Sequence, residues 1–179
     1  MEIQELINRT AIELTKRIED SQALLVFAKR RAKFEGWLKV ELIDILLKSG
    51  IENVVPEAEL IDVSFEDVAI ELKTVNTNYR DRNRIAGSTV RPITRNVDSI
   101  IADIAKHRKR KSAHKHKYVI FIVFPLEENH RNWDVQLTKI QDALCNDCRP
   151  HFFNFGGLEN SISGCLYFGK VGEMITKVK

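Results

Sequence analysis

The chain has 179 residues and a formal net charge of +3, with 44% hydrophobic and 30% charged residues. This length fits one domain, and the composition excludes wholesale disorder and fibrous repeats, because the apolar content can offset the entropy cost of folding. No basic segment is followed by a long apolar run, so we expect neither a signal peptide nor a membrane span, and a cytoplasmic location.

The beginning of the chain is predicted to be helical. Apolar residues at helical spacing indicate a helix over residues 3–19, and Ser21 is a residue type that opens a second one. That second pattern weakens at Gly36, where the helix resumes or restarts, and ends near Gly50, which favours a helix C-terminus. About 50 residues are therefore expected to be helical.

Short runs rich in β-branched residues follow and predict strands over residues 51–55, 60–65 and 68–75, with a tight turn between the last two. A polar connection over residues 76–94 and a helix around residues 100–105 come next. Later elements are predicted as a strand over 118–124 buried on both faces, a helix over 133–144, and strands over 151–155 and 162–168. This order predicts an α/β fold with a mixed sheet.

Two acidic residues and a lysine stand out in the predicted hairpin. Side chains alternate along a strand, so Glu71 and Lys73 share one face while apolar residues occupy the other. Pairing of the two strands would place Asp62 near Glu71. Two carboxylates about 4 Å apart repel by roughly 4 kcal/mol at an effective dielectric near 20. A cation is therefore expected there, either Lys73 or Mg²⁺, which prefers oxygen ligands.

Asp62, followed after eight residues by Glu71, Leu72 and Lys73, resembles the motif of the PD-(D/E)xK nuclease superfamily. The resemblance implies Mg²⁺-dependent hydrolysis of phosphodiester bonds, with Mn²⁺ as a substitute. It implies that Asp62, Glu71 and the backbone carbonyl of Leu72 hold the metal, and that Lys73 orients or activates the attacking water. Glu41, on the preceding helix, matches an additional acidic residue that many members place beside the metal.

The resemblance also implies the domain organisation, a restriction-endonuclease-like mixed β-sheet flanked by helices. We expect a single domain with an N-terminal helical extension (1–33), a catalytic core (34–125) and a C-terminal helix and strands that complete the sheet (126–179). The predicted activity is a DNA endonuclease of restriction or repair type, acting as a homodimer. The alternative is a noncatalytic nucleic-acid-binding or assembly module that retains the fold.

Simpler explanations of the motif residues remain open. A salt bridge on a solvated sheet face would account for Glu71 and Lys73 alone. On a helical wheel Glu41 lies with Asp44 and Lys48, so it could belong to a polar stripe.

Positive charge is concentrated in one segment. Residues 76–117 contain 12 Lys/Arg and 3 Asp/Glu, while the rest of the chain is net acidic. We interpret this segment as a phosphate-binding surface, and its few aromatic residues favour duplex DNA over stacked single strands. A solvated helix end would also explain its second half. The predicted nucleic-acid contacts are Arg80, Arg82, Arg84, Arg91, Arg95, Arg108, Lys109, Arg110 and Lys111.

Three cysteines and a histidine form a second candidate site. Cys145, Cys148, His151 and Cys165 could supply a zinc site, although the spacing is unusual. Free thiols are the alternative, because three cysteines cannot all pair within one chain.

Overall fold

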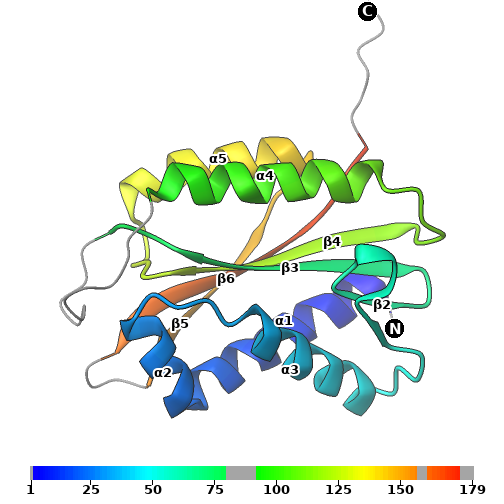
Figure 1. The fold of residues 1–179 in the computed structure, drawn as a ribbon, viewed down its shortest axis with the longest axis horizontal. Coiled ribbons are helices and arrows are strands. Elements are labelled where there is room, and N and C mark those ends of the chain that lie inside the picture. Colours follow the sequence, from blue (N-terminus) through cyan, green and yellow to red (C-terminus); the bar gives the residue numbers. More distant parts are fainter. Residues whose placement is uncertain (1, 80–91, 157–160, 174–179) are drawn as a thin grey trace, which may run out of the picture.

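The computed structural model describes residues 2–79, 92–156 and 161–173, which form three layers with the sheet in the middle (Figure 1). Two helices, α4 (Ile93–Lys109) and α5 (Arg131–Leu144), cover the upper face. The lower face is covered by α1 (Ile3–Asp20), α2 (Gln22–Lys29) and α3 (Glu35–Lys48). The predicted α/β class with a mixed sheet is confirmed.

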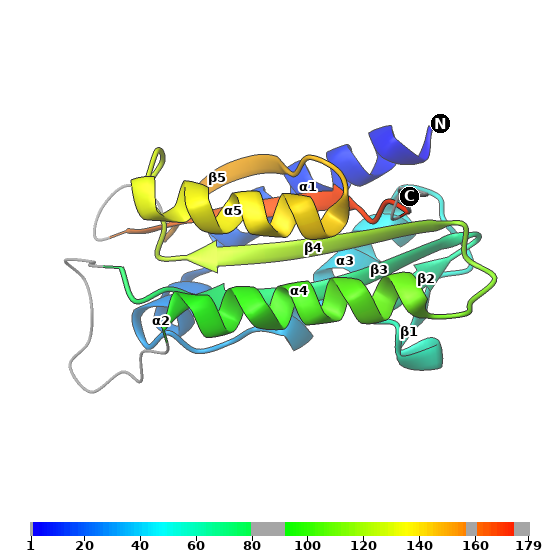
Figure 2. The same cartoon turned by 90° about the horizontal axis from the view of Figure 1, so that it is seen from above.

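The described residues form one sheet of six strands in the order β1-β2-β3-β4-β6-β5. Their bounds are β1 Val55–Pro56, β2 Val63–Phe65, β3 Val68–Asn76, β4 His116–Phe124, β5 Arg149–Phe155 and β6 Ile162–Lys170. Only β3 and β4 pair in parallel, and the other neighbours are antiparallel. Parallel neighbours need a crossover connection, and α4 provides it by running above β3 and β4 (Figure 2).

The predicted helices at the start of the chain are confirmed, and the helix restarts at Glu35, next to Gly36. The hydroxyl of Ser21 accepts a hydrogen bond of 3.3 Å from the backbone N–H of Leu24 and so caps α2. Arg31 then adopts a left-handed backbone conformation, with φ of 56°, which separates α2 from α3. The new helix α3 begins at Glu35.

Helix α1 belongs to the lower layer of the domain. Its buried residues Ile7, Leu14 and Ile18 share one apolar core with Phe155 and Leu166 of the sheet. Helix α1, which belongs to the expected N-terminal extension (1–33), therefore covers one face of the chain's own sheet. No helix among the described residues is long and apolar enough to cross a bilayer.

The bounds predicted for the first two strands, residues 51–55 and 60–65, are wrong, because both observed strands begin later. Strand β1 has only two residues, and residues 58–60 form a 3₁₀ turn in place of the start of a strand. The physical reason is a series of left-handed backbone angles, with φ of 55° at Glu57, 53° at Glu59 and 64° at Leu60. A strand cannot continue through such angles.

The predicted connection after β3 is also shorter than expected. Helix α4 begins at Ile93, and Pro92 is its N-cap residue. Arg95 therefore lies in the first turn of a helix and not in a loop.

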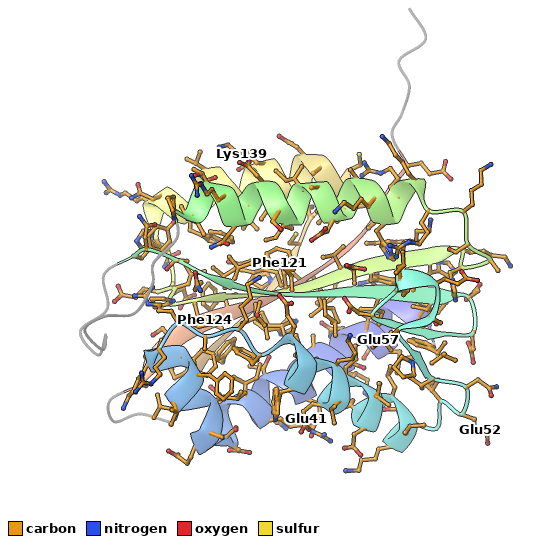
Figure 3. The ribbon with its side chains drawn as sticks, in the orientation of Figure 1. Glu41, Glu52, Glu57, Phe121, Phe124 and Lys139 are labelled. Carbon is orange, nitrogen blue, oxygen red and sulfur yellow. The ribbon has the colours of Figure 1, made fainter. Side chains whose placement is uncertain are left out.

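Both faces of the central strands are covered, as predicted for β4. Phe121 lies in the upper core and Phe124 in the lower core, on opposite sides of the sheet (Figure 3). On β3, Ile70 and Leu72 belong to the lower core. The strand alternation directs Glu71 to the upper side, where α4 covers the sheet.

Candidate metal-dependent active site

The candidate site is built on an open edge of β3. Strand β2 pairs with β3 only as far as Ile70, whereas β3 continues to Asn76. Beyond Ile70, carboxylate oxygens accept the backbone hydrogen bonds that a neighbouring strand would otherwise accept. The N–H of Leu72 donates to Asp62 Oδ2 at 2.8 Å, and the N–H of Thr74 donates to Glu35 Oε1 at 2.9 Å. Asp62 and Glu35 thus satisfy backbone donors that an edge strand would otherwise leave to solvent.

Asp62 lies between the 3₁₀ turn and β2. Its Oδ1 is 2.9 Å from Lys39 Nζ, and the same ammonium group is 2.7 Å from Glu57 Oε1. Burial opposes the charge of Lys39, but hydrogen bonds to Glu57 and Asp62 outweigh burial and raise its pKa. Asp62 is therefore held at the strand edge by a backbone N–H on one oxygen and a lysine on the other.

Glu71 lies on the upper face of β3, with its side chain only 18% exposed. Burial raises the pKa of Glu71 to about 7, and the charges of Asp62 and Asp103 add to this effect more than Arg110 and Lys73 offset it. Its Oε2 atom is buried without a hydrogen-bond partner and lies 3.9 Å from Arg110 Nη1. This carboxylate consequently needs either a proton or a further cation.

Lys73 is paired with an acid from α4. Its Nζ atom lies 2.6 Å from Asp103 Oδ2, and the other oxygen of Asp103 is 3.3 Å from Lys106 Nζ. Burial disfavours the ammonium form, but Asp103 and the charges of Glu35 and Glu71 raise the pKa of Lys73. Lys73 is therefore an ammonium ion at neutral pH.

Three of the predicted catalytic residues, Asp62, Glu71 and Lys73, thus lie on or beside β3. The charge of Asp62 contributes to the raised pKa of Glu71, and Asp62 itself binds the N–H of Leu72, the residue next to Glu71. The backbone C=O of Leu72 points to the same edge as its N–H, because both groups of one strand residue lie on the same side.

Glu41 does not join this group. Its Oε2 lies 2.5 Å from Arg17 Nη1, and the same guanidinium group is 2.7 Å from Asp44 Oδ2. Figure 3 places Glu41 on the helices below the sheet. Glu71 instead lies on the opposite face, where α4 packs on β3 and Arg110 lies near its carboxylate. The polar-stripe interpretation of Glu41 fits the structure, and the assignment of Glu41 as a metal ligand does not.

The predicted phosphate contacts have different environments. Arg108 donates to the carbonyls of Gly172 and Ala143 and so ties α4 to α5 and to the segment after β6, which makes it structural. Arg110 faces Glu71. Lys109 and Lys111 are exposed, as is Arg95 in the first turn of α4. Four of the predicted contacts, Arg80, Arg82, Arg84 and Arg91, lie outside the described residues.

The sequence interpretation missed the partners that come from helices. Glu35 and Lys39 are separated by four residues and lie on the same side of α3. Asp103 and His107 of α4 and Arg110, its C-cap residue, recur at the spacing of one helix face. Polar residues repeating beside the apolar positions of an amphipathic helix were the signal that could have revealed them.

The cysteines do not form the proposed zinc site. Cys145 is exposed, whereas Cys148 and Cys165 are buried. Burial raises the pKa of both buried thiols to about 12, which disfavours the thiolate form that zinc binds. Within residues 2–79, 92–156 and 161–173, no three His, Cys, Asp or Glu side chains are arranged to hold a metal ion.

A groove of about 480 Å³ lies elsewhere, between α1 and α3, and is lined by Arg9, Thr10, Arg17 and Lys48 among others. Arg17 is neutralised there by the acids described above. We place the candidate chemistry at the edge of β3, because the groove contains no group with comparable unsatisfied charge.

Comparisons of the chain with protein-family models, with curated proteins and with solved structures find no significant match. Functional inference therefore rests on the site geometry and on the motif.

Proposed function

We propose that this protein is a Mg²⁺-dependent DNA endonuclease with a restriction-endonuclease-like fold. The observation that carries the proposal is the placement of Asp62 at the open edge of β3, next to the strand residues Glu71 and Lys73, whose side chains lie on the face that α4 covers. The order of helix, three strands, helix and strand from α3 to β4 supports it, as does the parallel pairing of β3 with β4.

The residues at this edge fit a hard divalent cation. Asp62, Glu71 and the carbonyl of Leu72 would supply three oxygen ligands. Mg²⁺ is commonly bound through only one or two carboxylates, with water and substrate phosphate completing its shell. The unpartnered Oε2 atom of Glu71 is the specific feature that a cation would satisfy.

When bound, Mg²⁺ supplies polarisation of the phosphodiester and a lower pKa for a coordinated water. Asp62 is held in place for its role by Lys39 and by the N–H of Leu72. Lys73 contributes positive charge beside the carboxylates, where it would stabilise the charge that develops on the phosphate.

Exposed lysines supply a second part of the proposal, contact with the DNA backbone. Lys109 and Lys111 lie at the end of α4 and directly after it, and both are exposed. Together with the predicted arginines of residues 80–91 they would contribute sequence-independent affinity. Mn²⁺ as a substitute metal and a cytoplasmic location also remain proposals.

A homodimer stays a prediction, which the long helical segment at the start of the chain favoured because it exceeds what a nuclease core requires. The helical segment at the start of the chain packs against its own sheet. Sedimentation with and without DNA tests the dimer directly.

The proposed activity is tested by incubating plasmid DNA with the purified protein and Mg²⁺, Mn²⁺ or EDTA. We expect cleavage with either metal and none with EDTA. Asp62→Asn and Glu71→Gln should abolish cleavage while leaving the protein folded, since both substitutions keep the shape of the side chain. Glu41→Gln is the matched control and should remain active. Cleavage retained by the purified Asp62→Asn and Glu71→Gln variants would refute the assignment.

A noncatalytic nucleic-acid-binding module is the second candidate. The absence of a three-ligand side-chain cluster among the described residues favours it. Calorimetry separates the two functions. DNA binding without uptake of Mg²⁺ or Mn²⁺ would favour the binding module, whereas metal uptake that Asp62→Asn abolishes would favour the nuclease.

A further inference from the structure

We infer that Arg110 is a substrate-binding residue of the proposed site, whose guanidinium group binds the phosphate that is cleaved. This inference rests on the proposed function and assigns one residue to the reacting phosphate, in addition to those that would hold the metal. It also separates Arg110 from Lys109 and Lys111, for which contact with the DNA backbone alone is proposed.

The backbone of Arg110 is fixed at the end of α4, where Arg110 is the C-cap residue. Its N–H donates to the carbonyl of Lys106 at 3.0 Å, and its own carbonyl accepts a hydrogen bond of 2.7 Å from Lys117 Nζ. Because both backbone groups are bonded, the side chain leaves the helix from a defined point. It extends toward Glu71 on β3, with Nη1 3.9 Å from Glu71 Oε2.

The guanidinium group of Arg110 has donors without acceptors. A guanidinium carries five N–H donors. Within the described residues the Arg110 side chain donates no hydrogen bond, and its Nη1 atom is buried without a partner. The 3.9 Å separation from Glu71 is that of an ion pair and is too long for a hydrogen bond. The side chain is 21% exposed, so a ligand can reach its remaining donors.

The neighbouring basic residues are placed differently. Arg108 donates to two backbone carbonyls beyond α4, which uses its guanidinium group for packing. Lys109 and Lys111 are exposed. Of the four basic residues at positions 108–111, Arg110 is therefore the one whose charge is directed at the candidate site.

Positive charge exceeds negative charge around Glu71. Lys73 and Lys106 both contact Asp103, while Arg110 faces Glu71, so three cations share two acids. Once Glu71 binds a further cation, Arg110 has no other acid to pair with among the described residues. A phosphate would then supply the missing acceptor, because guanidinium groups bind phosphate oxygens through two parallel hydrogen bonds.

Contact between Arg110 and the cleaved phosphate would favour hydrolysis. During the reaction the water oxygen forms a bond to phosphorus, and the bond from phosphorus to the leaving oxygen breaks. The water proton passes to solvent, and the leaving oxygen takes up a proton from solvent. Arg110 neither gives nor takes a proton, and its fixed positive charge offsets the negative charge that builds up on the phosphate oxygens.

The first test measures DNA binding in EDTA, where metal-dependent cleavage does not occur. Binding of a duplex oligonucleotide is followed by fluorescence anisotropy at a series of salt concentrations. Arg110→Gln should make the slope of log K against log salt shallower by about 0.9, the effect of one lost phosphate contact. Arg110→Lys keeps the charge and should keep the slope. Lys139→Gln, at an exposed position of α5, is the matched control and should bind like the wild type.

The second test measures cleavage with Mg²⁺ in the same variants, after circular dichroism has confirmed their folding. Arg110→Gln should lower kcat by about 10²- to 10³-fold, the usual cost of removing one donor to developing charge, with a smaller change in KM. Arg110→Lys should recover only part of kcat, because an ammonium group lacks the forked geometry of a guanidinium. If Arg110→Gln does not fold, Arg110→Lys decides, and a wild-type kcat in that variant would overturn the inference.

Two results from folded Arg110→Gln would also overturn it. An unchanged salt slope would show that Arg110 contacts no phosphate. A shallower slope with an unchanged kcat would place the contact at a phosphate that is not cleaved. Absence of metal-dependent cleavage in the wild type would instead refute the proposed function, and the salt slope in EDTA would still decide whether Arg110 binds a phosphate.

Discussion

The buried carboxylate of Glu71 predicts how the stability of the metal-free protein depends on pH. The pKa of Glu71 rises from 4.5 to about 7 on folding. Below pH 4.5 the group is protonated in both states and has no effect. Between these values only the unfolded state releases the proton, so stability falls as pH rises, and above about pH 7 the loss is complete. At 1.36 kcal/mol per pKa unit, the loss from pH 5 to pH 8 is about 2 to 3 kcal/mol.

Glu71→Gln removes this loss, because the amide carries no charge at any pH. Urea denaturation at a series of pH values from 5 to 8 measures it. We expect the variant to be more stable than the wild type by about 2 kcal/mol at pH 8 and nearly equal to it at pH 5.

Glu52→Gln is the matched control, since Glu52 is an exposed carboxylate in the loop after α3 (Figure 3). This variant should follow the wild type at every pH. Addition of Mg²⁺ should stabilise the wild type at pH 8 more than Glu71→Gln, because bound metal favours the ionised carboxylate. Parallel pH curves for wild type and Glu71→Gln would refute the assignment of a strained, buried charge to Glu71.

Two further predictions concern the basic residues. Arg108→Ala should lower the free energy of unfolding by about 1 to 3 kcal/mol, because it leaves the carbonyls of Ala143 and Gly172 without their donor. In urea denaturation, Lys109→Ala should change it by less than about 0.5 kcal/mol, and equal effects would contradict the structural role of Arg108. Replacing Arg80, Arg82 and Arg84 together with Ala should make the slope of log K against log salt for duplex DNA shallower by about 2.7. An unchanged slope would remove these arginines from the DNA interface.

Local patterns were enough to predict most of the fold. The apolar run of β4 indicated burial on both faces, and Ser21 marked the start of α2. The same local reasoning failed at Leu60, because its apolar character favours a strand while its backbone adopts a left-handed turn. Positive φ angles at non-glycine residues are imposed by the surrounding packing, and residue type alone does not announce them.

In the candidate site, too, contacts between residues close in sequence could be predicted, whereas contacts between separate helices could not. Asp62 and Glu71 belong to one hairpin, so their proximity follows from strand pairing over a short separation in sequence. Glu41 was favoured by its place in the motif, but its partner Arg17 comes from a helix whose docking the motif does not encode. Predicting that ion pair requires knowing which faces of α1 and α3 meet.

The placement of the motif side chains therefore depends on elements outside the motif. Lys39 from α3 fixes one oxygen of Asp62, and Asp103 from α4 holds the ammonium group of Lys73. Because α4 also forms the crossover between the parallel strands β3 and β4, the connection that creates the sheet topology is the one that brings Asp103 to the site. A sequence with the same hairpin but an apolar residue in place of Asp103 would keep the motif and lose the carboxylate that pairs with the ammonium group of its lysine. The spacing of Asp62, Glu71 and Lys73 identifies where the chemistry is expected, and the packing of α3 and α4 determines which charged groups contact these side chains.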